Sequence, residues 1–169
     1  ATSGEVDWMA QTSNEATLSG ELSQGGDASY RAQVGGGMEL STSDGDLVLW
    51  RATGADIEVF GEGAFRLLAG ELREASLSGK TFQAVGGVYY SDREITARAN
   101  EVVASADGEM QLEGAEGRPV ELELREAELT DEGEVSAQRI RFKEGDLSAA
   151  GGVIARLQRG EEKVELEAE

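Results

Sequence analysis

The feature that most constrains the fold of this chain is a strict alternation of apolar and polar residues in short runs. Val120, Leu122 and Leu124 alternate with Glu121 and Glu123, and comparable runs recur roughly every 8–12 residues with turns between them. Successive side chains of a strand point to opposite faces, so this pattern predicts strands with one buried and one solvated face. No segment has a convincing helical period. We therefore expect an all-β fold.

One part of the sequence also repeats. Residues 71–77 recur as residues 123–129, and residues 90–97 match residues 142–149, both at an offset of about 52 residues. Such internal similarity indicates that one strand unit is stacked on the next. A stack of this kind has an elongated surface, which suits binding or bridging better than catalysis.

Glycine is abundant, with 23 residues, whereas proline occurs once. This combination fits a sheet protein with many tight turns and bulges, because proline cannot donate a hydrogen bond to the ladder. We expect residues 35–37, three consecutive glycines, to end a strand or form a bulge, and the change of phase between Ala137 and Ile140 to mark a bulge. The length of 169 residues is typical of one domain. The expected organisation is a loose lead-in over residues 1–14 and a single domain over residues 15–169.

The formal net charge is −19, from 34 acidic and 15 basic residues. This charge opposes binding to nucleic acids, which requires basic side chains that displace counterions from phosphates. The chain has no histidine and no cysteine, which excludes catalytic triads, zinc sites and thiol chemistry built from its own residues. We expect no enzyme activity, no metal and no cofactor. No run reaches the roughly 18 apolar residues of a membrane span. Because the sequence starts without methionine, we expect an exported protein whose signal peptide or anchor was removed.

The C-terminal third of the sequence resembles a known family. An ordered succession of a small-residue strand, an aromatic residue, a turn glycine and an apolar run is similar to the repeat of the OstA-like family (LptA and LptC) of periplasmic lipopolysaccharide-transport proteins. The same order is found at residues 95–114, and a poorer version at residues 44–47, so the resemblance covers residues 40–169. The residues that carry it are Val135-Ser136-Ala137, Ile140-Arg141-Phe142, Gly145-Asp146-Leu147-Ser148-Ala149 and Gly151-Gly152-Val153.

The resemblance implies a twisted antiparallel β-jellyroll built from stacked short strands. It also implies a hydrophobic groove that shelters the acyl chains of a lipid or lipopolysaccharide-like amphiphile, and edge-to-edge association with partner proteins or with further copies in the periplasm. The residues expected to line the groove occupy the apolar phase of successive strands. They are Ile95, Ala97, Met110, Leu112, Leu122, Leu124, Val135, Phe142, Leu147 and Val153.

Two alternatives to a lipid carrier remain open. One is a self-associating β-scaffold whose interior is simply packed, and the other is an extracellular carbohydrate-binding β-sandwich, although only 5% of the residues are aromatic. The lipid headgroups of the family are anionic and would be repelled by the acidic chain at long range. Four arginines either contact such headgroups or pair with neighbouring glutamates: Arg98, Arg125, Arg139 and Arg141.

Overall fold

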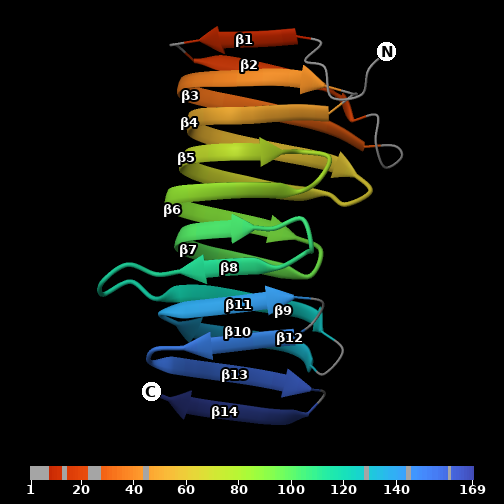
Figure 1. Ribbon diagram of the computed structural model, residues 1–169. Coiled ribbons are helices and arrows are strands. Elements are labelled where there is room, and N and C mark those ends of the chain that lie inside the picture. Colours follow the sequence, from red (N-terminus) through yellow and green to blue (C-terminus); the bar gives the residue numbers. More distant parts are fainter. Residues whose placement is uncertain are drawn as a thin grey trace.

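The computed structural model describes residues 8–12, 15–22, 28–43, 46–127, 130–143, 146–159 and 161–169. Within these residues the secondary structure consists of fourteen β-strands in one antiparallel sheet. The prediction of an all-β, twisted antiparallel jellyroll is thereby confirmed. The strands are stacked from the N-terminus to the C-terminus like rungs (Figure 1). They are β1 Trp8–Thr12, β2 Ala16–Leu22, β3 Ala28–Ser43, β4 Asp46–Gly61, β5 Phe65–Ser76, β6 Thr81–Asp92, β7 Ile95–Ala104, β8 Met110–Glu113, β9 Val120–Ala127, β10 Thr130–Ala137, β11 Arg139–Lys143, β12 Asp146–Ala150, β13 Val153–Arg159 and β14 Glu162–Ala168.

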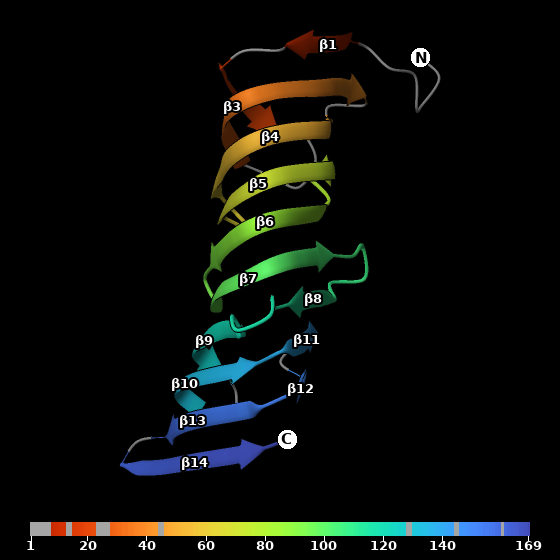
Figure 2. The ribbon, with the colours of Figure 1, turned by 90° about the vertical axis from the view of Figure 1, so that its left-hand side faces the viewer.

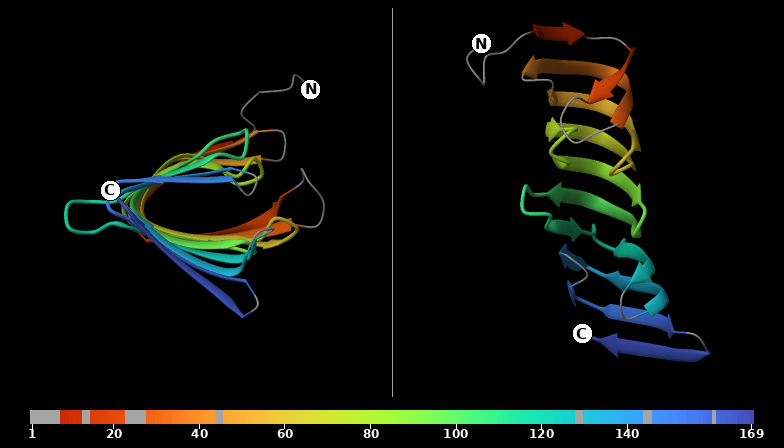
Figure 3. Two further views of the ribbon diagram at one scale, coloured as in Figure 1. Left: turned by 90° about the horizontal axis from the view of Figure 1, so that it is seen from below. Right: turned by 90° about the vertical axis from the view of Figure 1, so that its right-hand side faces the viewer.

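The sheet is folded back on itself into two arms that meet at a bend and are open on the opposite side (Figure 3, left). Arm A contains β2, β9, β10, β13 and β14, and arm B contains β1, β8, β11 and β12. Strands β3 to β7 run through the bend and contribute one half to each arm. For example, β3 pairs with β4 over residues 28–34 in arm A and again over residues 37–43 in arm B. The two inner faces are apolar and pack against each other, which forms the core.

Glycine allows the long strands to turn at the bend. Gly54 of β4 and Gly86 of β6 have φ angles of 61° and 80°, a conformation that other residues rarely adopt. Gly70 of β5 lies so close to β6 that an added Cβ would be 2.8 Å from the carbonyl oxygen of Gly86. The expectation that residues 35–37 end a strand was wrong, because β3 continues through them, with a register shift between Val34 and Gly37. The alternative expectation, a bulge at these residues, is confirmed.

In the C-terminal part of the stack, no strand of the described residues runs through both arms (Figure 2). Strand β8 lies in arm B and β9 in arm A, joined by a loop over residues 114–119 that projects from the bend. The phase change between Ala137 and Ile140 is the crossing from β10 in arm A to β11 in arm B, rather than the bulge that the sequence predicted.

Strand β1 corrects the expected lead-in. Residues 8–12 pair with residues 38–42 of β3, so this segment belongs to the sheet. The other residues of the expected lead-in, 1–7 and 13–14, lie outside the described residues. Residues 8–12 do not alternate between apolar and polar, so no strand was predicted there, and the edge of β3 provides the partner.

Candidate functional site

The inner face of the sheet is the candidate site. Register partners form rows of side chains that run along the stack on this face. In arm A, Ile95 is followed by Leu124, Gly133, Leu157 and Val164. In arm B the opposing row consists of Phe82, Ala104, Met110, Phe142 and Leu147. Both rows lie near the open side, at the tips of the arms.

The structure brings the ten predicted groove residues together on this inner face. Six of them are buried in the core, namely Ile95, Ala97, Met110, Leu112, Leu122 and Val135. The other four, Leu124, Phe142, Leu147 and Val153, are partly buried and pack against the same core. The six buried residues are covered by neighbouring side chains, so here they form an ordinary packed interior. Only the other four are accessible to a ligand without movement of the arms.

The inward-facing side chains become less buried toward the C-terminal end of the stack. In the arm A row, Ile95 is buried, Leu124 and Leu157 are partly buried, and Val164 of β14 is 47% exposed. Leu166, the next inward residue of β14, is 55% exposed. Figure 3 shows the reason, since the C-terminal strands of arm A diverge from arm B. We call this region, lined by Leu124, Phe142, Leu147, Leu157 and Val164, the mouth.

Leu157, Val164 and Leu166 were not among the predicted groove residues. Their alternation is as regular as that of the predicted residues, so the phase of each strand could have identified them. The sequence does not show that β14 is the last strand and that nothing covers its inner face within the described residues.

The open side is closed midway along the stack by a group that we call the tip cluster: Phe65, Lys80, Phe82, Tyr90 and Asp92. The rings of Phe65 and Tyr90 in arm A stack with a centroid distance of 5.9 Å, and Phe82 in arm B lies 6.0 Å from Tyr90. Lys80 lies at the tip of arm B, and its Nζ is 3.2 Å from Oδ2 of Asp92 at the tip of arm A. The same Nζ lies 5.4 Å from the centroid of Phe65. The tip cluster therefore joins the two arms.

Asp92 is held by several donors. Tyr90 donates its hydroxyl to Oδ2 at 2.6 Å, and the backbone N–H groups of Glu94 and Ile95 donate to Oδ1. Burial by itself raises the pKa of Asp92, but these hydrogen bonds and the charge of Lys80 outweigh it and leave the pKa below its ordinary value. Burial, followed by the charge of Asp92, raises the pKa of the Tyr90 hydroxyl. Asp92 is thus a carboxylate and Tyr90 a neutral donor at neutral pH.

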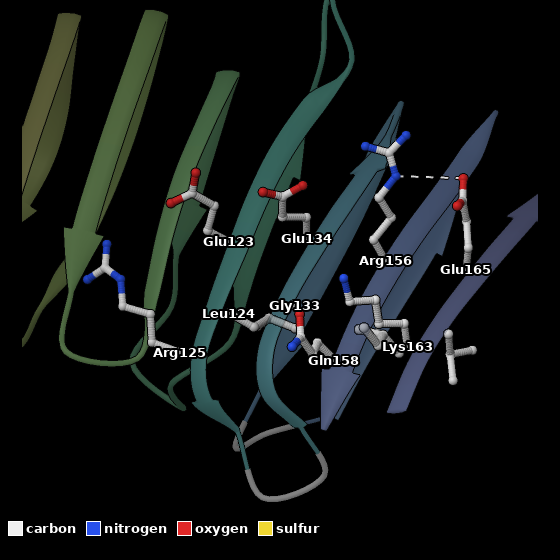
Figure 4. Close-up of a pocket in the computed structure, with 11 residues that line it drawn as sticks. Glu123, Leu124, Arg125, Gly133, Glu134, Arg156, Gln158, Lys163 and Glu165 are labelled. Atoms are coloured by element: carbon white, nitrogen blue, oxygen red, sulfur yellow. Dashed lines mark ion pairs between the residues drawn. The ribbon is translucent and has the colours of Figure 1, made fainter. Parts of the chain in front are cut away.

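The outer face is charged. A groove of about 710 Å³ crosses β9, β10, β13 and β14 (Figure 4). Its charged lining comes from the outward-pointing residues of these strands, and Leu124, Gly133, Leu157 and Val164 of the arm A row line it as well. Glu123, Glu134, Arg156 and Glu165 follow one another as register partners across this groove. Arg156 Nε lies 3.6 Å from Glu165 Oε1. Such a ladder suits a solvated sheet face and offers little to an acyl chain.

The four arginines considered for anionic headgroups already have partners. Arg139 and Arg141 pair with Glu113 and Glu109 on the outer face of arm B, which is the pairing with glutamates that the sequence left open. Arg125 instead donates to the carbonyl oxygen of Asp92 and to the hydroxyl of Thr96. Arg98 lies over the ring of Tyr89, 5.3 Å from its centroid.

The described residues contain no group of three or more carboxylates that could hold a metal ion. Among them there is also no helix with the length and apolar character needed to cross a bilayer. Comparison of the chain with protein-family models, with curated proteins and with solved structures gave no match.

Proposed function

We propose that this protein is an exported lipid-binding protein that shelters acyl chains at the mouth between its arms and associates with partners through its strand edges. The proposal rests on one observation, namely that inward-facing apolar side chains become exposed to solvent toward β14. Inward-facing side chains of Val164 and Leu166 are about half exposed there, next to the half-buried Leu124 and Leu157. Contiguous exposed apolar surface on an otherwise acidic protein is typical of an interaction site.

An acyl chain fits this surface chemically. Each methylene group transferred from water to an apolar surface contributes about 0.8 kcal/mol, so about five methylene groups correspond to a dissociation constant of about 1 mM and the longer chain of a fatty acid can bind more tightly. Alternation places the charges of Glu123 and Glu134 on the outer face, so the inward positions Leu124 and Gly133 of the same strands carry no charge. The half-buried positions belong to the part of the chain that resembles the OstA-like family, and the resemblance supports a lipopolysaccharide-like ligand and a periplasmic location.

Strand edges provide the surface for association. Among the described strands, β14 pairs only with β13 and β12 only with β11, while β1 and β2 each pair only with β3. Each end of the stack therefore offers unpaired backbone donors and acceptors to an added strand.

Native mass spectrometry of the protein mixed with palmitate and with a lipid A preparation tests the proposal. We expect bound palmitate or lipid A, and clearly less of both bound to Leu147→Asp at the same ligand concentration. A folded protein that takes up neither amphiphile would contradict the carrier function. That outcome would favour the second candidate, a self-associating scaffold, which is supported by the fully buried inner residues of β3 to β7, such as Leu40, Leu49 and Leu72.

A further inference from the structure

The tip cluster divides the cleft between the arms into two unequal parts. On its N-terminal side the inward residues Leu40, Leu49 and Ile57 are fully buried. On its C-terminal side the two tip rows stay buried at Ile95 and Met110. The next residues of these rows, Leu124 in arm A and Phe142 in arm B, are only partly buried, so the accessible part of the inner face begins there.

The ion pair of the tip cluster differs from the others in its position. The other ion pairs between described residues stay within one arm on the outer face, as Arg31–Glu58 does in arm A and Arg139–Glu113 in arm B. Lys80–Asp92 instead spans the open side of the cleft, from the turn between β5 and β6 to the end of β6. Asp92 faces inward because it is the register partner of the buried Phe65.

An inward carboxylate at this position requires a partner, because an unpaired charge next to apolar side chains is costly. Lys80 supplies the partner from the opposite arm and also covers the rings of Phe65 and Tyr90. If the arms separated here, Asp92 would lose its cation and the three rings would be exposed to water. The arrangement therefore favours contact between the arms at this level and leaves the C-terminal level free to open.

We propose that the tip cluster is a clamp that ties the arms together and sets the N-terminal limit of the acyl-chain site. The position of the limit rests on the proposed lipid-binding function, whereas the tie between the arms does not. An acyl chain enters at the mouth, lies along Phe142, Leu147 and Leu124, and stops at the tip cluster. Passage farther along the stack requires separation of Lys80 from Asp92.

The tie between the arms is tested without lipid. The chain has no cysteine, so Arg93→Cys and Ala106→Cys place two unique spin labels on exposed turns at the tips of arm A and arm B. We expect Lys80→Gln to lengthen and broaden the distance distribution measured by pulsed electron paramagnetic resonance. Arg31→Gln, which breaks an ion pair within arm A, is the matched control and is expected to change nothing. An unchanged distribution in both Lys80→Gln and Asp92→Asn would overturn the proposal. Asp92→Asn gives the second reading if Lys80→Gln does not fold.

The limit of the site is tested with a diazirine-labelled palmitate. After photolysis and cleavage at glutamate, mass spectrometry locates the labelled peptides. In the unchanged protein we expect label in the peptides that contain Phe142 or Leu147, and background in the peptide of residues 40–58, which contains Leu49 and Ile57. Lys80→Gln is expected to raise the label in the peptide of residues 40–58 several-fold.

The outcomes of the labelling experiment are separable. Equal label on both sides of the tip cluster in the unchanged protein would overturn the clamp as a limit and leave lipid binding intact. The same conclusion follows if Lys80→Gln and the unchanged protein are labelled in the same peptides to the same extent. Absence of label from the whole chain would contradict lipid binding, and the spin-label distances would then decide on the tie between the arms.

Discussion

An aspartate should have different effects at two inward positions, Leu122 in the packed interior and Leu147 at the mouth. Leu122 is 1% exposed and is surrounded by the core. Leu122→Asp removes a buried leucine, worth about 2–5 kcal/mol, and adds an unpaired buried charge that costs several kcal/mol more. Because domains are stable by only about 5–15 kcal/mol, we expect this variant to be unfolded or to melt at a far lower temperature.

Leu147 is half-buried at the mouth, where an aspartate carboxylate can reach water. Most of the transfer free energy of a buried leucine is lost in this variant, about 1–2 kcal/mol, which corresponds to a decrease in Tm of about 2–8 °C for a chain of this size. The charge would keep about two methylene groups of a bound acyl chain from the surface, or about 1.6 kcal/mol, which corresponds to roughly a tenfold loss of affinity. The variant should fold and bind weakly.

Thermal unfolding followed by far-UV circular dichroism and displacement of a fluorescent fatty acid measure the two quantities separately. Ser148→Asp adds the same charge at the exposed neighbouring position and is expected to leave both quantities unchanged. The reasoning fails if Leu122→Asp melts within a few degrees of the unchanged protein. It also fails if Leu147→Asp binds the fatty acid with unchanged affinity, because the mouth would then not be the site.

Three further predictions concern stability. Gly70→Ala places a Cβ 2.8 Å from the carbonyl oxygen of Gly86 and should lower the free energy of unfolding by about 1–3 kcal/mol in urea denaturation; Gly35→Ala, whose Cβ would be 3.7 Å from its nearest neighbour, should have little effect. The pKa of Asp92 is lower in the folded than in the unfolded protein, so its contribution to stability is present above about pH 4 and is lost as the pH falls through the folded value. The difference in stability between the unchanged protein and Asp92→Asn should therefore shrink in urea titrations below about pH 4, and a constant difference would contradict the assignment. Arg139→Gln breaks an exposed ion pair with Glu113 and should cost less than about 1 kcal/mol, a loss that should decrease further when the salt concentration is raised.

The face of each strand could be predicted from the sequence. Leu122 and Val135 point inward and Glu121 and Glu134 outward, as their alternation indicates, because side chains in a strand have a period of two. The bend could not be predicted. A glycine that lets a strand turn a corner, such as Gly70, resembles a glycine in a loop until the pairing of residues far apart in the sequence is known.

The repeat at an offset of about 52 residues has a structural meaning that the sequence did not show. Residues 71–76 run from the bend to the tip of arm B, whereas residues 123–127 run from the bend to the tip of arm A. Three passages across the bend separate them, namely in β6, in β7 and between β8 and β9. Each passage takes the chain from one arm to the other. After three passages the second copy of the repeat therefore lies in the arm opposite to the first copy.

Aromatic residues show where local pattern was insufficient. Trp50 lies in an apolar run that predicts burial, but it is 48% exposed, and its indole N–H donates to Ser41 on the outer face. A register shift places Leu49 opposite Leu40 and Arg51 opposite Glu39, which leaves Trp50 without a register partner. The ion pair between Lys80 and Asp92 could not be predicted from the sequence either. Local pattern could not show that the bend brings the tip of arm B to Asp92.

The continuity of strands across the bend explains why the cleft opens at the C-terminal end. Strands β3 to β7 are hydrogen-bonded to one another in both arms, so the angle between the arms is fixed by five neighbouring bends that share their ladders. Beyond β7 the arms contain separate strands, and the crossing from β12 to β13 is made by Gly151 and Gly152, with φ angles of 83° and 60°. Short glycine links constrain an angle less than a continuous ladder does. The tip cluster lies on β5 and β6, and β7 is the last strand that runs through the bend, so both the clamp and the continuous backbone hold the arms up to this part of the stack and the mouth begins beyond β7.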